Sequence, residues 1–186
     1  MPKLLTVIAS TRPGRVGRPV GEWFVQLARS DGRFDVQMVD LFELALPLLD
    51  EPHHPRLRNY TKDHTKEWSA TVAAADVIVF VTAEYNYGYP AALKNAIDYL
   101  HHEWRHKALG YVSYGGIAAG TRAVQQLKQV TQAVGLMSAQ LIVNIAWVAQ
   151  KMNEDGQFEA DDDNNQAAAA MLGELMLLDG ALRNLR

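Results

Sequence analysis

Short apolar runs alternate with amphipathic stretches along this chain. Strands are predicted for five runs rich in β-branched and aromatic residues: LLTVIA (4–9), FDVQMVDL (34–41), DVIVFVTA (76–83), ALGYVSY (108–114) and AQLIVNIA (139–146). Four of these runs are almost continuously apolar, which is typical of strands in a parallel sheet that is covered on both faces. The second run alternates more between apolar and polar residues, so we expect it at an edge of the sheet.

Between these runs, apolar residues recur at the three- and four-residue spacing of helices. Five such stripes occupy residues 20–28, 68–75, 93–104, 124–134 and 171–185. Pro90 falls in the first turn of the third stripe, where a missing N–H costs no hydrogen bond. Strands and helices alternate five times, which predicts an open, doubly wound α/β sheet.

Composition narrows the class of protein. The 186 residues suit a single domain over 1–186, since the chain shows neither a linker nor an internal repeat. The net charge of −3 gives no basic surface for nucleic acid or for an anionic membrane. The chain has no cysteine, which excludes disulfides, thiolate metal sites and a cysteine nucleophile. The first apolar run is too short for a secretory signal, and none approaches a membrane helix, so we expect a cytoplasmic protein.

The segment HEWRH, residues 102–106, fits the H-E-x-x-H pattern of zinc proteases. In such sites two histidines one helical turn apart bind zinc together with a third ligand. Here the segment follows the third helical stripe and the next strand begins near Ala108, so we expect His106 at or beyond the helix end. Three further histidines lie in or beside the loop after the second strand, with no reason to converge on it: His53, His54 and His64. No metal site is predicted.

Two segments are predicted to be loops. Residues 46–62 contain three prolines and two adjacent histidines. Residues 153–165 carry six acidic side chains and no basic one: Glu154, Asp155, Glu159, Asp161, Asp162 and Asp163. We interpret the acidic segment as a solvated loop that caps the last helix.

In open α/β sheets, ligands bind beyond the carboxyl ends of the strands. After the first strand, ASTRPGRVGRPV offers hydroxyls, arginines and glycines at the start of a helix, which favours a single phosphate. It has neither a Walker A lysine nor the G-x-G-x-x-G pattern. After the third strand, three tyrosines beside Asn86 and Gly88 offer surfaces to a flat aromatic ligand. The alternatives are a generic polar turn and half-buried tyrosines that only pack their loop. After the fourth strand, SYGGIAAG permits close approach of the backbone to a ligand.

Together, STRPGR after the first strand, EYNYGYPAALKNAIDYL after the third and SYGG after the fourth resemble the NADPH-dependent FMN reductase family. The resemblance covers essentially the whole chain in order and length. It implies a three-layer, flavodoxin-like α/β fold with a doubly wound, five-stranded parallel sheet in the order 2-1-3-4-5. It also implies non-covalently bound FMN at the carboxyl edge of that sheet.

The resemblance assigns the binding residues one by one. The FMN phosphate is expected on Ser10, Arg12 and the backbone of Arg15, Val16 and Gly17. The flavin ring is expected against Glu84, Tyr85, Asn86 and Tyr87, after Ala83, with Ser113, Tyr114, Gly115 and Gly116 on the opposite side. The chain departs from the family pattern at Ala83, where a proline is usual, and alanine leaves φ free at the start of this loop.

The resemblance implies that NADPH, or NADH, passes hydride to flavin N5, and that a small acceptor is then reduced in a ping-pong cycle. The acceptor could be free flavin, a quinone, an azo compound or a metal oxyanion. No catalytic side chain is assigned, because the flavin carries the chemistry. The main alternative is a flavodoxin-type electron carrier that binds FMN and meets protein partners, although the chain lacks the strong acidity of such carriers. A flavin-binding subunit or sensor is a third hypothesis.

The resemblance also implies a homodimer or homotetramer that packs through the helix around residues 90–104. Besides its inward stripe, this segment carries Asn95, Asp98, Tyr99 and Trp104. We interpret these residues as a second, amphipathic face that contacts a partner subunit. The alternative is a solvated helix face.

Overall fold

The strand regions expected from the sequence form one parallel sheet in the computed structural model, which describes all 186 residues. The first four strands lie in the order β2-β1-β3-β4, with the bounds Asp35–Asp40, Lys3–Ile8, Val77–Ala83 and Ala108–Tyr114. β2 pairs only with β1 and therefore lies at an edge, as its alternating pattern predicts. The expected order 2-1-3-4-5 is confirmed.

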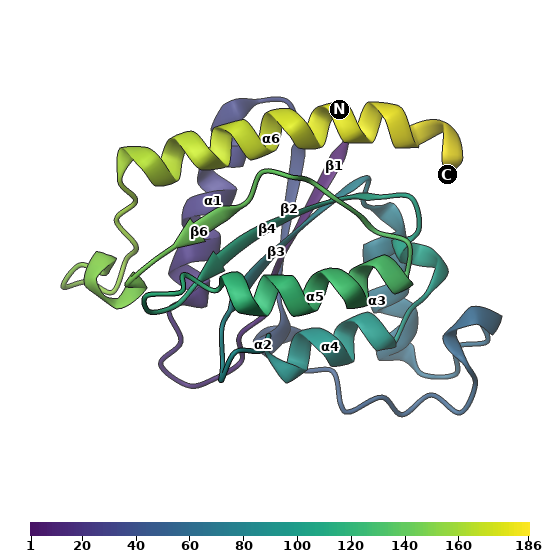
Figure 1. Ribbon diagram of the computed structural model, residues 1–186. Coiled ribbons are helices and arrows are strands. Elements are labelled where there is room, and N and C mark those ends of the chain that lie inside the picture. The colour runs from purple at the N-terminus through teal and green to yellow at the C-terminus, as the bar shows by residue number, and fades with distance from the viewer.

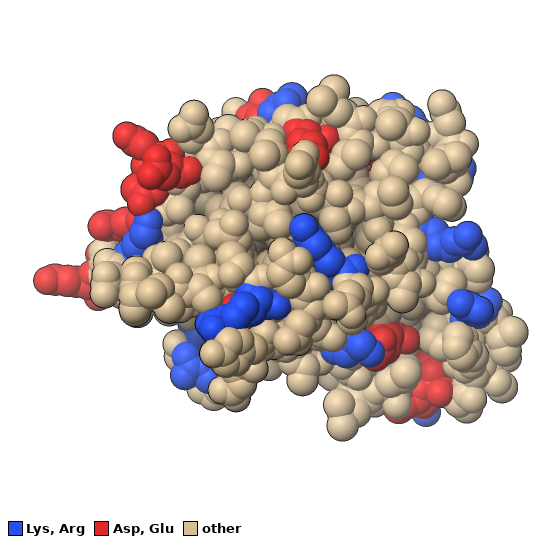
Figure 2. All heavy atoms as spheres, viewed as in Figure 1, with Lys and Arg blue, Asp and Glu red and all other residues tan.

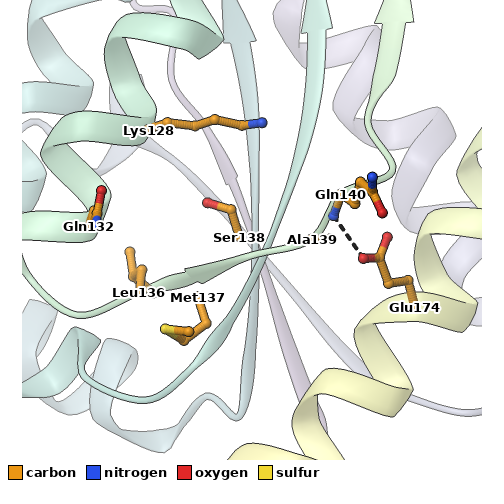
Figure 3. Close-up of a pocket in the computed structure, with 8 residues that line it drawn as sticks. All are labelled: Lys128, Gln132, Leu136, Met137, Ser138, Ala139, Gln140 and Glu174. Atoms are coloured by element: carbon orange, nitrogen blue, oxygen red, sulfur yellow. Dashed lines mark hydrogen bonds between the residues drawn. The ribbon is translucent and has the colours of Figure 1, made fainter.

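The fifth strand position is interrupted. β5 (Met137–Ser138) pairs with the start of β4, and β6 (Val143–Ile145) pairs with its end. Between them, the N–H groups of Gln140 and Leu141 donate to the carboxylate of Glu174 at 2.7 and 2.8 Å, and a dashed line in Figure 3 marks the bond from the backbone of Gln140. The prediction of one continuous fifth strand was wrong, because these N–H groups bond to a helix side chain instead of continuing a strand.

Helices cover both faces of the sheet and give the molecule three layers (Figure 1). One face carries α1 (Gly17–Asp31) and α6 (Asp162–Leu182), and the other carries α3 (Asp63–Ala74), α4 (Ala91–Asp98) and α5 (Thr121–Ala133). Phe24 and Leu175 pack with Val79 in the core of the first face, and Trp68 packs with Phe80 in the core of the second. Val79 and Phe80 are successive residues of β3 and point to opposite faces, so this strand contributes to both cores.

The third predicted helix is shorter than its apolar stripe. α4 ends well before Trp104, and the chain continues through a turn into a 3₁₀ segment, His102–Trp104. The indole N–H groups of Trp68 and Trp104 donate to the carbonyls of Ala96 and Ile97, at 2.9 and 3.1 Å. The Ile97 carbonyl also accepts the N–H of Leu100 at 3.2 Å, so the indoles and one tighter backbone bond take the place of the next α-helical turn.

The outer face predicted for this segment is only partly present. Tyr99 and Trp104 are fully buried within the subunit, so their assignment to a partner-facing surface was wrong. The Tyr99 hydroxyl donates to the carbonyl of Pro47 at 3.1 Å, and Trp104 fills the core. Asn95 and Asp98 are partly exposed, as predicted.

HEWRH does not lie on a continuous helix. His106 has a φ of 59°, a left-handed conformation outside the α-helical range, and its N–H donates to the carbonyl of Gly135 at 2.9 Å. His102 Nε2 lies 3.0 Å from the carbonyl oxygen of Arg56. The two histidines therefore do not lie one turn apart on a helix. This confirms the prediction that His106 falls at or beyond the helix end.

Both predicted loop segments are largely irregular. The first contains only a short 3₁₀ turn, Pro55–Leu57. In the second, the Asp161 carboxylate accepts the N–H of Asn164 at 2.8 Å, and Asp162 and Asp163 lie in the first turn of α6. The acidic segment thus caps the last helix, as predicted, and Figure 2 shows acidic side chains gathered at this end of the molecule.

Candidate functional site

Three loops of the sheet meet at its carboxyl edge. The phenol of Tyr114, the last residue of β4, donates to the hydroxyl of Ser10 just beyond β1, with 2.9 Å between the oxygens. The N–H of Glu84, which follows β3, donates to the carbonyl of Tyr114 at 3.2 Å. The predicted residues of all three segments are therefore brought together around one buried tyrosine.

The turn between β1 and α1 presents free hydrogen-bond donors. The N–H groups of Val16 and Gly17 donate to no backbone carbonyl, and no side chain caps α1. Ser10 is fully buried and accepts from Tyr114, while its own proton has no acceptor within the protein. Donors at a helix N-terminus favour an anion, so this turn fits a phosphate group.

Gly17 allows α1 to approach this hydroxyl pair closely. A Cβ at this position would lie 2.3 Å from Ser10 Oγ and 2.4 Å from Tyr114 Oη. Burial raises the pKa of the Tyr114 phenol, which therefore stays protonated and remains a donor. The missing side chain of Gly17 thus brings the free end of the helix next to Ser10.

The two arginines of this turn have different surroundings. Arg12 is exposed. Arg15 pairs with the buried carboxylate of Asp40, and its guanidinium carbon lies 4.4 Å from the ring centroid of Phe42. The Arg15 N–H donates to the carbonyl of Arg12 at 3.2 Å. Arg15 therefore stabilises the turn, and the free backbone donors are the N–H groups of Val16 and Gly17.

The loop after β3 is a tight turn in a strained conformation. Tyr85 and Gly88 exchange two backbone hydrogen bonds, of 2.8 and 2.9 Å. Between them, Asn86 and Tyr87 have φ values of 50° and 69°, and positive φ at both central positions is the mark of a type I′ turn. Asparagine tolerates this region, whereas Tyr87 is strained by its Cβ. Tyr85 and Tyr87 are exposed, and Ala83 is buried at the strand end.

Arg122, which lies outside the predicted motifs, contacts this loop in two ways. Its N–H and its Nε donate to the carboxylate of Glu84, at 3.1 and 2.6 Å. Its guanidinium carbon lies 3.8 Å from the centroid of the Tyr87 ring. Arg122 lies in the first turn of α5, where the helix dipole disfavours a positive charge. An arginine at the start of a predicted helix was therefore the sequence signal for a nearby acidic partner.

Of the four candidate residues at the end of β4, Ser113, Tyr114, Gly115 and Gly116, only the two glycines are accessible. Ser113 is fully buried, and its hydroxyl bonds to the carbonyl of Ala119 at 2.8 Å. The carbonyl of Gly115 accepts the N–H of Val148, and the carbonyl of Gly116 accepts the N–H of Trp147. Ser113 and Tyr114 therefore shape the loop from within, while the two glycines lie at its surface.

Trp147 is a second residue outside the predicted motifs. It is 50% exposed and has a φ of 51°. Its N–H donates to the carbonyl of Gly116 at 3.2 Å. An exposed aromatic side chain beside these glycines offers a further flat surface at this edge, and the only sequence signal was an aromatic residue directly after the last strand region.

The predicted flavin residues line none of the five main cavities. The largest cavity, of about 530 Å³, lies at the opposite edge of the sheet beside Asp76, His102 and Lys107. Another, of about 400 Å³, lies between α5 and α6 at the interrupted fifth strand (Figure 3). At the carboxyl edge, the side chains of Tyr85, Tyr87 and Trp147 are exposed.

Known proteins are similar to this chain in sequence and in fold. Residues 2–154 match the profile of the family described as NADPH-dependent FMN reductase. The chain is 44% identical over 131 residues to an NAD(P)H-dependent FMN reductase of Schizosaccharomyces pombe, covering 69% of this chain and 65% of that protein. It is 45% identical over 106 residues to one of Saccharomyces cerevisiae, covering 54% and 55%. The match thus spans less than two thirds of the length of either relative.

The fold also has solved counterparts. The flavoenzyme NAD(P)H:(acceptor) oxidoreductase of Paracoccus denitrificans superposes with a TM-score of 0.76, covering 97% of this chain and 98% of the other. The sequences are 17% identical, so the likeness concerns the fold alone. It agrees with the flavodoxin-like architecture expected from the sequence.

Proposed function

Because the chain belongs to the NADPH-dependent FMN reductase family, we propose that it is an FMN-dependent NAD(P)H oxidoreductase that reduces a small acceptor. The proposed acceptors are free flavin, a quinone or a related compound, and the whole of residues 1–186 serves as one FMN-binding domain. FMN, when bound, supplies the group that takes up hydride and passes electrons on.

One observation carries the proposal: the uncapped N-terminus of α1 lies beside a buried hydroxyl whose proton has no acceptor in the protein. A phosphate group would accept from Ser10 and from the N–H groups of Val16 and Gly17. Arg12 is exposed beside them and would add charge. The exposed tyrosines stand at the same edge of the sheet, where we propose that the ring attached to that phosphate lies.

The remaining residues would orient the flavin ring. We assign one side of the ring to the turn at Tyr85, Asn86 and Tyr87 and the other to Gly115 and Gly116. The glycines permit close approach of backbone to the ring, and the tyrosines are exposed for stacking. The carboxylate of Glu84 is occupied by Arg122, so its part is to hold the loop.

The proposal is tested by a visible spectrum of the purified protein, followed by addition of NADPH. We expect the absorption of oxidised flavin and its bleaching on reduction. Steady NADPH oxidation with a quinone or excess FMN, and with no protein partner, is expected of a reductase and separates it from an electron carrier. A colourless protein that takes up no added FMN would contradict the proposal.

We also propose that the protein forms a homodimer or homotetramer through α4 and the loop beside it. Leu48 and Leu49 are 84% and 42% exposed. The N–H of Leu49 donates to the side chain of Asn95 at 2.9 Å, which places this apolar pair against α4. Exposed apolar side chains that lie together favour association. Light scattering that shows a monomer at micromolar concentration would argue against it.

The cytoplasm is the compartment that we propose. None of the helices has the length and the apolar character needed to cross a membrane. The chain also lacks the cysteines that stabilise many secreted domains. Cell fractionation tests the proposal, and recovery of the natural protein in a membrane or secreted fraction would contradict it.

A further inference from the structure

The turn after β3 keeps a conformation that its own residues do not favour. Both central residues of the Tyr85–Gly88 turn have positive φ, and only the asparagine suits this region. Ala83, at the end of β3, does not restrict its own φ as a proline would. Two backbone hydrogen bonds within the turn act against this strain, and contacts from outside the turn add to its stability.

Arg122 supplies those contacts from the start of α5. Its guanidinium binds the Glu84 carboxylate, with N–O distances of 2.5 and 2.6 Å, and covers the ring of Tyr87. The same carboxylate accepts the N–H of Arg122 and so satisfies a free donor of the helix. Only 7% of the Glu84 side chain is exposed, against 43% for Arg122, so the pair is partly shielded from water and the contact is stronger than at an open surface.

We propose that Arg122 is a positioning residue, which holds the Glu84–Gly88 turn in the conformation that receives the flavin ring. The inference rests on the proposed function, because the ring is assigned to this turn. Arg122 acts by fixing Glu84 before the turn and Tyr87 within it. Without Arg122 the strained turn would populate other conformations, and the affinity for FMN would fall with the fraction that remains competent.

The first experiment measures the turn itself, in flavin-free protein, by hydrogen exchange. The amides of Tyr85 and Gly88 are bonded across the turn, so their exchange reports its opening. In Arg122→Ala we expect these two amides to exchange at least about tenfold faster than in the wild type. Gln125→Ala, an exposed change in the same helix, is the matched control and is expected to leave them unchanged. Exchange in Arg122→Ala that equals the wild type would overturn the inference.

The second experiment titrates FMN into each variant and follows the quenching of flavin fluorescence. If about a tenth of the Arg122→Ala molecules keep the turn in its binding conformation, the FMN Kd is expected to rise about tenfold, because only that fraction can bind. Arg122→Lys keeps the charge but loses the planar stacking and the fork geometry, so little recovery is expected. A wild-type affinity in Arg122→Lys would show that charge alone suffices and would contradict the geometric role. If the wild type binds no FMN while the exchange result holds, the proposed function fails and the positioning of the turn by Arg122 stands.

Discussion

At the scale of single residues, the close packing of the candidate site requires a glycine at position 17. Gly17 lies where a Cβ would collide with two buried hydroxyl groups, those of Ser10 and Tyr114. The two hydroxyls share a hydrogen bond and both residues are buried, so a new methyl group at this position would have to displace them. A glycine is therefore required here by the packing of α1 against these two side chains.

We expect Gly17→Ala to weaken both folding and FMN binding. Alanine favours a helix by about 0.5–1 kcal/mol over glycine, but overpacking costs about 1–3 kcal/mol, so the net effect is a loss of stability. Denaturant unfolding and FMN titration are the measurements. Gly180→Ala, at a helical glycine with open space around it, is the control and should be neutral or slightly stabilising. A Gly17→Ala protein with unchanged stability and FMN affinity would contradict the close packing.

Glu103, the glutamate of HEWRH, is a buried acceptor. It accepts from Tyr60, from Ser69 at 2.8 Å and from the N–H of His101. Burial alone would raise its pKa, but these hydrogen bonds outweigh burial and hold the pKa of Glu103 below its ordinary value. A carboxylate with a lowered pKa stabilises the fold above its unfolded pKa, and this contribution is lost as the pH falls through the folded pKa.

We therefore expect Glu103→Gln to lower the free energy of unfolding by about 1–3 kcal/mol at neutral pH. Between neutral pH and the acid range, the variant should lose less stability than the wild type, because it has no carboxylate to protonate at this position. Urea unfolding at several pH values measures both effects. The exposed change Glu154→Gln is the control, and a variant with the pH dependence of the wild type would refute the assignment.

The sequence predicted that the candidate site residues meet at one edge of the sheet, but it did not predict the contacts among them. Ser10, Gly17 and Tyr85 belong to local motifs, and parallel strands bring such motifs to one edge. Arg122 has no motif of its own, because its partner lies on another loop. The N–H of Arg15 was assigned to the ligand, yet it closes a turn with Arg12. A backbone donor's partner depends on dihedral angles that a residue pattern does not specify.

At the scale of elements, the ends of helices and strands were the least predictable features. The apolar stripe continues through Trp104 because that residue is buried, but burial does not require a helix. Two indole N–H groups end α4 by bonding to its carbonyls. The fifth strand likewise has an apolar sequence throughout, and a carboxylate from α6 interrupts it. Both interruptions come from side chains distant in sequence.

We expect Glu174→Ala to loosen the interrupted strand. The N–H groups of Gln140 and Leu141 would lose their acceptor, and water would replace it in part because both residues are exposed. The expected cost is about 1–2 kcal/mol in unfolding free energy, with faster hydrogen exchange at these two amides. Gln166→Ala, at an exposed position of the same helix, serves as the control. Unchanged exchange at both amides would mean that Glu174 is not their stabilising partner.

At the scale of the whole molecule, one ionic network joins elements that are far apart in sequence. Asp179 of α6 is fully buried and pairs with Arg183 and Arg186. Arg186 also donates to the carboxylate of Asp76, before β3, at 3.0 Å. The same carboxylate accepts the N–H of Lys3, the first residue of β1, at 2.8 Å. The network therefore connects the last helix to two strands of the sheet.

Removing one member of this network should cost more than removing a surface pair. In Arg186→Ala the buried carboxylate of Asp179 keeps only the largely exposed Arg183 as partner, and we expect a loss of about 1–3 kcal/mol in unfolding free energy. Lys66→Ala breaks an exposed pair with Asp63 and should change stability by less than about 1 kcal/mol.

The double variant Arg186→Ala with Asp179→Asn then tests the coupling between these two residues. If the pair interacts as the structure shows, the two losses will differ from additivity by at least about 0.5 kcal/mol. Strictly additive losses would mean that Arg186 stabilises the fold through Asp76 alone.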